Sequence, residues 1–194
     1  MITTLKNSKG GETEPGTKNT EEFRLRHFDS ISEEFASLED LFENFIEISN
    51  EAKILGGEFL NNLSKITEVI ITRGNHDLRK KNLNRIDSIK VVVELIDNPK
   101  ITYYDVSGIY KDGNFSWVVY DHADKLGDPW VGEVKEKEQI YIGLFHDPID
   151  NCTNDFGKVF KSSTYKSIDD FRKNDFVLLG DIHKRQYFRK NKGQ

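Results

Sequence analysis

Polar side chains that can bind metal or transfer protons follow three apolar runs of the chain. Each run is a strand candidate, and the loop after it opens with histidine, aspartate or asparagine. In chain order the motifs are Gly74-Asn75-His76-Asp77 after Val69-Ile70-Ile71, His146-Asp147 after Ile140–Phe145, and Gly180-Asp181-Ile182-His183 after Phe176–Leu179. Imidazole nitrogens with carboxylate and amide oxygens form a ligand set suited to Mn, Fe, Zn or Mg.

The repetition of this pattern matters more than any one histidine. A single histidine at the end of a strand more often forms hydrogen bonds within its own loop than binds a metal ion. Here three of the five histidines, His76, His146 and His183, occupy such positions. Loops at the carboxyl ends of strands are where α/β sheets usually hold ligands. The sequence therefore predicts that the three loops converge on one pocket.

Alternating helix and strand patterns surround these motifs. Apolar spacing predicts a helix from Ser30 to Ile46 and a shorter helix after Gly56-Gly57, with Phe59, Leu60, Leu63 and Ile66 facing inward. A third helix is expected over Ile86–Ile96. Strands are expected at Glu68–Thr72, Ile101–Tyr104, Phe115–Tyr120, Ile140–Phe145 and Phe176–Leu179. This mixture predicts a layered α/β sandwich.

Composition indicates an intracellular soluble protein. The chain has 194 residues and one cysteine, Cys152, which excludes an internal disulfide framework and fits a reducing compartment. No apolar run approaches the roughly 20 residues that cross a bilayer, so we expect no membrane association. The net charge of -5 argues against binding nucleic acid through a global basic field. Residues 1–20 read as a disordered leader and residues 21–194 as one domain.

The order of the three motifs resembles the calcineurin-like metallophosphoesterase superfamily. Gly74-Asn75-His76-Asp77 matches its GNH[DE] motif, His146 its isolated strand-end histidine, and Gly180-Asp181-Ile182-His183 its Gly-His-x-His motif. Within the superfamily, the run Gly180–Gln186 is similar to that of SbcD-type DNA repair nucleases, above all of viral or phage relatives. The resemblance implies an α/β/β/α sandwich, of which this chain is a part that is incomplete at both ends.

The resemblance also implies a role for each motif residue. Asn75, His146 and Asp181 would bind one divalent metal ion, and His183 would bind a second. His76 would protonate the leaving oxygen or stabilise charge in the transition state, and Asp77 would fix an orientation nearby. The expected cofactors are two divalent ions, with Mn first and Mg, Fe or Zn as alternatives. The expected reaction is metal-assisted hydrolysis of a phosphodiester, possibly DNA, and the nuclease resemblance implies an ATPase partner subunit.

Two departures from the family pattern qualify this reading. Asp181 stands where the family usually has histidine, so the site would carry about one more negative charge and favour a harder cation. The Asp-x-His and Gly-Asp-x-x-Asp motifs that the family places upstream of Gly74 do not occur here. The alternative to a phosphodiesterase is therefore a catalytically incomplete fragment that acts only as a folded or interaction module.

Three other features carry weaker signals. Asp121-His122 ends a strand candidate and fits a surface turn better than a further contribution to the pocket. Trp117 and Trp130 fit core or loop anchors better than base-stacking platforms. Cys152 has no base partner at a strand end, so it is a poor candidate for a nucleophile.

Overall fold

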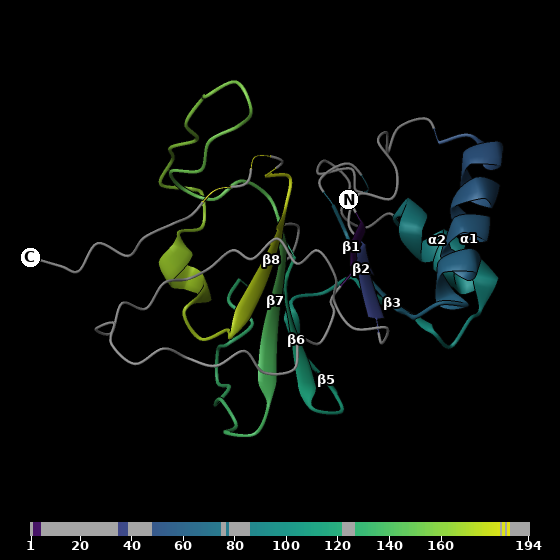
Figure 1. Ribbon diagram of the computed structural model, residues 1–194, viewed down its shortest axis with the longest axis horizontal. Coiled ribbons are helices and arrows are strands. Elements are labelled where there is room, and N and C mark those ends of the chain that lie inside the picture. The colour runs from purple at the N-terminus through teal and green to yellow at the C-terminus, as the bar shows by residue number, and fades with distance from the viewer. Residues whose placement is uncertain are drawn as a thin grey trace, which may run out of the picture.

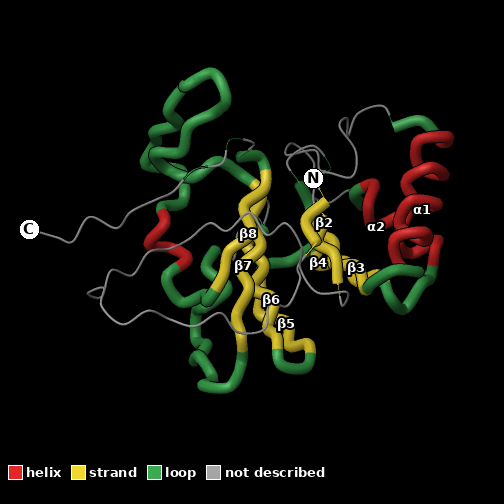
Figure 2. Tube along the Cα trace, in the orientation of Figure 1, coloured by secondary structure: helices red, strands yellow, loops and turns green. Residues whose placement is uncertain are grey.

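Two four-stranded sheets pack face to face, with two helices on one side (Figure 1). The computed structural model describes residues 2–4, 35–38, 48–74, 77, 86–121, 127–182, 184 and 186. Sheet A has the order β1-β2-β3-β4 and sheet B the order β5-β6-β7-β8. Figure 2 shows α1 and α2 beside sheet A, and the longest described loops beside sheet B.

The bounds of the elements agree with most of the predicted ones. Sheet A consists of β1 (Ile2–Thr4), β2 (Phe35–Leu38), β3 (Glu68–Thr72) and β4 (Ile101–Tyr104). Sheet B consists of β5 (Gly108–Asp112), β6 (Phe115–Tyr120), β7 (Ile140–His146) and β8 (Phe176–Gly180). The helices are α1 (Asn50–Ser64), α2 (Ser88–Ile96) and the short 3-10 helix η1 (Ile168–Phe171).

Alternation along the strands builds three apolar clusters between the layers. In β3, Val69 and Ile71 pack with Leu60 of α1 and with Ile89 and Val92 of α2. A second cluster fills the space between the two sheets, where their inner faces meet: Ile70, Trp117, Val119, Ile142 and Leu144. The outer face of sheet B packs against loops and η1 in a third: Val118, Tyr120, Trp130, Tyr141, Phe145, Ile149, Cys152 and Phe171. The predicted layered α/β fold is confirmed, and the two tryptophans are buried as expected.

Parallel pairing directs the functional loops to one end of each sheet. Strands β2, β3 and β4 are parallel in sheet A, and β6, β7 and β8 are parallel in sheet B. The loops after β3, β7 and β8 are the three that carry the motifs. Each therefore leaves its sheet at the carboxyl edge, where α/β proteins hold ligands.

Helix α1 differs from the prediction. It runs through Gly56-Gly57 without a break, and Ser49 caps its start by accepting a hydrogen bond from the Ala52 amide at 3.1 Å. Leu60 is buried as expected, but Phe59 and Ile66 are 38% and 75% exposed, so their inward orientation was wrong. Gly57 faces α2, where an added Cβ would lie 3.7 Å from Ile96 and Val92, an ordinary contact distance, so the packing does not require glycine there.

Three strands lie where the sequence predicted something else. Phe35–Leu38, inside the expected helix from Ser30 to Ile46, is β2, because parallel pairing with β3 overrides the local helical spacing. The rest of that expected helix lies outside the described residues. Ile2–Thr4, within the expected leader, forms β1 against β2. Strand β5 was missed, although the two-residue turn Gly113-Asn114 that joins it to β6 is a hairpin signal.

No helix in the described part of the chain has both the length and the apolar character of a membrane span. The expected α/β/β/α sandwich has a second layer of helices on the outer face of sheet B. Among the described residues, this face is covered by η1 and loops instead.

Two glycine-to-alanine variants should change stability in opposite directions. At Gly143 in β7, a Cβ would lie 2.7 Å from Nδ2 of Asn174, a buried side chain that donates to the Tyr120 hydroxyl at 2.8 Å. We expect Gly143→Ala to lower the free energy of unfolding by about 1–3 kcal/mol through overpacking. Gly57→Ala, whose Cβ would meet Ile96 and Val92 at ordinary van der Waals distance within a helix, should raise it by about 0.5–1 kcal/mol. Urea unfolding followed by circular dichroism measures both, and equal effects would contradict the described packing.

Candidate active site

The end of sheet B brings two predicted metal ligands to neighbouring strands. His146 is the last residue of β7 and pairs with Gly180, the last residue of β8. Asp181 follows Gly180 directly, so His146 and Asp181 lie at the same edge of the sheet. His146 is 6% exposed. An imidazole and a carboxylate thus come from segments of the chain that are far apart in sequence.

The Gly74–Asp77 motif forms a turn that its own aspartate closes. The Gly74 amide donates to Oδ2 of Asp77 at 2.9 Å, and the Asp77 amide donates to the Gly74 carbonyl at 3.3 Å. Asp77 is 1% exposed, so the turn is anchored inside the protein rather than in solvent. Asn75 and His76, which the turn carries, lie outside the described residues. The expected role of Asp77 in fixing an orientation beside the phosphate stays a prediction.

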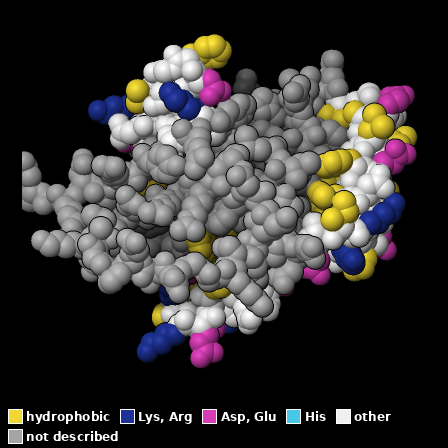
Figure 3. Space-filling view, in the orientation of Figure 1, with side chains coloured by type: hydrophobic (Ala, Val, Ile, Leu, Met, Phe, Trp, Pro, Cys, Tyr) yellow, Lys and Arg dark blue, Asp and Glu magenta, His cyan; other side chains and the backbone are white. Residues whose placement is uncertain are grey.

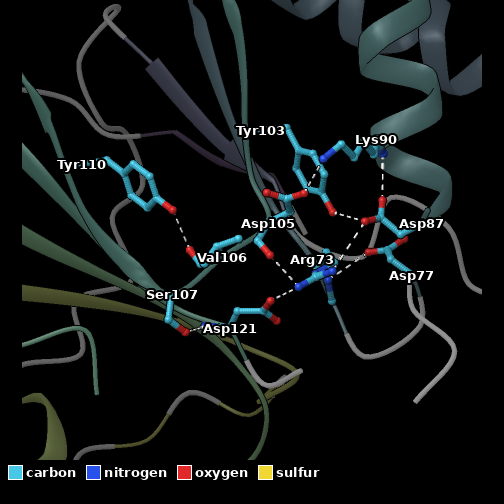
Figure 4. A network of polar contacts seen from close by, with 11 residues as sticks. Arg73, Asp77, Asp87, Lys90, Tyr103, Asp105, Val106, Ser107, Tyr110 and Asp121 are labelled. Carbon is cyan, nitrogen blue, oxygen red and sulfur yellow. Dashed lines mark hydrogen bonds and ion pairs between the residues drawn. The ribbon is translucent and has the colours of Figure 1, made fainter. Parts of the chain in front are cut away.

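Arg73, between β3 and this turn, connects the two sheets (Figure 4). Its Nη2 donates to the carboxylate of Asp121, at the end of β6, and to the backbone carbonyl of Asp105 at 2.6 Å. Its Nη1 lies 3.7 Å from Oδ2 of Asp87. The side chains of Arg73 and Asp121 are 13% and 3% exposed. The contact of Arg73 with Asp121 places the start of the turn beside the carboxyl edge of sheet B.

The sequence suggested that Asp121 lies in a surface turn, and for Asp121 this prediction was wrong. Its carboxylate is buried against Arg73, and its amide donates to Oγ of Ser107 at 3.0 Å. The sequence reading missed this role because the partner lies 48 residues away in the other sheet. His122 lies outside the described residues.

Asp87, the residue before α2, belongs to the same network of polar contacts as Arg73. Its Oδ1 accepts the Lys90 amide at 2.8 Å and so caps α2, and its Oδ2 accepts the Tyr103 hydroxyl at 2.8 Å. Burial, together with the charge of Asp87, raises the pKa of Tyr103. Tyr103 therefore stays protonated at physiological pH and remains a donor to Asp87.

Asp181 has an uncommon backbone conformation. Its φ is 61°, and the Ile182 amide donates to the Gly180 carbonyl at 2.7 Å across it. A three-residue turn with positive φ at a non-glycine residue is rare and strained, and such strain clusters at functional sites. After this turn, Ile182 packs against the apolar cluster on the outer face of sheet B.

A second loop is fastened to the segment after Asp181. The amide of Thr153 donates to Oε1 of Gln186 at 2.7 Å, and Nε2 of Gln186 donates to the Thr153 carbonyl at 2.7 Å. Thr153 lies in a hairpin. The Phe160 amide donates to the Cys152 carbonyl at 2.7 Å, and a bridge joins Thr153 to Val159. A cavity of about 230 Å³ lies between this hairpin and Asp181, with Pro148, Phe156 and Ile182 in its lining.

Cys152 at the base of this hairpin is a packing residue. It is 1% exposed, and burial raises the pKa of its thiol. A protonated, buried thiol is a weak nucleophile, as the sequence indicated.

The described residues do not by themselves complete a metal site. Within residues 48–74, 77, 86–121 and 127–182, no three histidine, cysteine, aspartate or glutamate side chains come together as a metal-binding group. Asn75 and His183, two of the four predicted ligands, fall outside the described part. Their roles, like those of His146 and Asp181, stay predictions.

Comparison with known families decides the class of the protein. Residues 28–185 match the family of calcineurin-like phosphoesterases, and this range includes all three motifs. The chain belongs to the calcineurin-like phosphoesterases. A calcineurin-like phosphoesterase is a hydrolase by family, and its members generally bind divalent metal ions.

One curated relative comes from a giant virus. The chain is 30% identical over 161 residues to the uncharacterized protein R555 of Acanthamoeba polyphaga mimivirus. The matched region covers 79% of this chain and 12% of R555, so the chain spans only a small part of its relative. No solved structure matches the chain.

The described donors suit the metal ions that the family implies. His146 and Asp181 offer an imidazole nitrogen and a carboxylate from adjacent strand ends, a mixed set for a first-row divalent ion. His146 and Asp181 are therefore two residues of this chain that could hold such an ion.

Proposed function

We propose that this calcineurin-like phosphoesterase is a metal-dependent phosphodiesterase that cleaves DNA. The observation that supports the proposal is the common edge. Arg73 ties the Gly74–Asp77 turn to the end of β6, which pairs with β7. Strand β7 ends in His146, and Asp181 follows the last residue of the next strand, β8. Groups for metal binding and for proton transfer would then share one site.

Each residue has a distinct part in the proposed reaction. Asn75, His146 and Asp181 would hold one divalent ion and His183 a second. When bound, the ions would supply Lewis acidity that polarises the phosphate and activates water. His76 would donate a proton to the leaving oxygen. Asp77, by accepting the Gly74 amide at 2.9 Å, would keep the turn that carries His76 in shape.

The hairpin beside Asp181 supports a nucleic-acid substrate. Phe156 at its tip is 95% exposed, and Val159 is 53% exposed. Nζ of Lys158 lies 5.5 Å from the centre of the Phe160 ring. Figure 3 shows hydrophobic side chains next to lysine or arginine on the lobe at the upper left, where this loop lies in Figure 1. Phe160 is half-buried, so the exposed ring of Phe156 would be the one on which a base of single-stranded DNA stacks, with Lys158 two residues along the chain.

Substrate profiling tests the proposal. The purified chain, supplied with Mn²⁺, should hydrolyse bis-p-nitrophenyl phosphate and single-stranded DNA, and a chelator should abolish both activities because the reaction depends on the ions. The monoester p-nitrophenyl phosphate should be a poorer substrate. A preference for the monoester would indicate a phosphomonoesterase of the same family. If none of these phosphoesters is hydrolysed with Mn²⁺, Mg²⁺, Zn²⁺ or Fe²⁺, the result would favour the alternative, a catalytically incomplete chain that acts as an interaction module.

A further inference from the structure

We propose that Arg73 is a positioning residue that fixes the Gly74–Asp77 turn to sheet B through Asp121. The inference rests on the proposed function in one respect, namely that the turn carries reacting groups. Arg73 itself would not touch the substrate, because its guanidinium is engaged by protein groups of both sheets (Figure 4).

The contacts of Arg73 come from three separate parts of the fold. Asp121 lies at the end of β6 in sheet B, Asp105 follows β4 in sheet A, and Asp87 caps α2. The side chain is 13% exposed, and its partners Asp121 and Asp87 are 3% and 2% exposed. A buried guanidinium between buried carboxylates has little freedom to move, since displacing it would leave uncompensated charges in the interior.

These contacts hold the residue before the functional turn and connect it to Asp87, further along the chain. Arg73 immediately precedes Gly74, and Asp87 follows the loop that starts with Asp77. Nη1 of Arg73 lies 3.7 Å from Oδ2 of Asp87, so the residue before the turn lies close to the residue that caps α2. The buried Asp77 closes the turn from within by accepting the Gly74 amide. Movement of Arg73 would therefore shift the turn relative to β6 and its neighbour β7.

Lysine cannot reproduce this arrangement. The planar guanidinium presents five donors in a fixed fork, so one side chain can engage Asp121, the Asp105 carbonyl and Asp87 together. A lysine keeps the charge but has one nitrogen on a flexible stem. Arg73→Lys is thus a variant that preserves charge and removes the multiple contacts. Asp121→Asn is the complementary variant, of equal shape without the charge.

The experiment compares Arg73→Lys, Asp121→Asn and the double variant with the wild-type chain. Steady-state hydrolysis of bis-p-nitrophenyl phosphate with Mn²⁺ gives kcat and KM. We expect Arg73→Lys to lower kcat about 10- to 100-fold with KM within a factor of about three, since a displacement of about 1 Å can cost two orders of magnitude. Asp121→Asn should lower kcat in the same sense. The double variant should be no slower than the slower single variant, because both changes break one contact.

Hydrogen exchange provides a measurement that does not need activity. Peptides that contain Gly74 and Asp77 should exchange faster in both single variants than in the wild type. The control is Lys135→Met, which removes the exposed ion pair of Lys135 with Asp175 before β8, at the opposite end of the sheet. It should leave kcat and the exchange of the turn unchanged. If Arg73→Lys fails to fold, as thermal unfolding would reveal, Asp121→Asn carries the test.

Two results would overturn the inference. A raised KM for Arg73→Lys with wild-type behaviour of Asp121→Asn would mean that Arg73 contacts the substrate directly. Unchanged exchange of the turn in both variants would mean that the network does not hold it. An inactive wild-type chain would instead count against the proposed function, and the exchange measurement would still decide the role of Arg73.

Discussion

Replacing His76 with alanine should reduce cleavage of DNA by about 10²- to 10⁴-fold, the usual contribution of a positioned general acid or base. The reduction should be smaller for bis-p-nitrophenyl phosphate, because p-nitrophenolate is a stable anion and leaves without a proton. Comparing kcat for the two substrates therefore separates two roles of His76. A loss confined to DNA indicates proton donation to the leaving oxygen, and equal losses indicate stabilisation of charge in the transition state.

His122→Ala is the matched control for this experiment, because it removes a histidine to which no role is assigned. It should retain wild-type rates on both substrates. Full activity of His76→Ala on DNA would show that the Gly74–Asp77 turn does not supply the acid, and the proposed function would lose its catalytic group.

Replacing His146 should weaken metal binding by at least about 100-fold. Loss of a residue that merely orients a ligand typically costs 10- to 100-fold in metal affinity, and a direct ligand should cost more. We expect His146→Ala to raise the Mn²⁺ concentration for half-maximal activity accordingly. Titration calorimetry with Mn²⁺ should show the same loss in the absence of substrate.

Because His146 is only 6% exposed, His146→Ala also leaves a small cavity, and stability has to be measured alongside. Circular dichroism and thermal unfolding serve this purpose, and His146→Gln provides a variant closer in volume. Wild-type Mn²⁺ affinity in a folded His146→Ala protein would remove His146 from the metal site.

The strands that hold the site were predictable because they are apolar on both faces. The run Val69-Ile70-Ile71 alternates between the helices and sheet B, so every residue is buried and the segment reads as a strand from composition alone. The same reasoning found β7 and β8. Strand β5 escaped it, since Gly108–Asp112 is half-exposed or exposed along its length and lacks a continuous apolar run.

The sequence named candidate residues for the site, whose roles stay predictions, but it could not predict their surroundings. Motif spacing pointed to Asp77, His146 and Asp181, and strand register brings the last two to neighbouring strands. The Arg73–Asp121 contact joins residues 48 positions apart, and its existence depends on how the two sheets dock. No local pattern reports such docking. Phe35–Leu38 shows the same limit, since its helical spacing yields to pairing with β3.

The backbone at Asp181 has a consequence for how the site can change over evolutionary time. Among residues other than glycine, positive φ is enriched in asparagine, aspartate and histidine, and φ here is 61°. The histidine usual in the family and the aspartate of this chain therefore fit the same turn after β8. A lineage can exchange one for the other, and so alter the charge of the site, without rebuilding the strand or the loop that presents it.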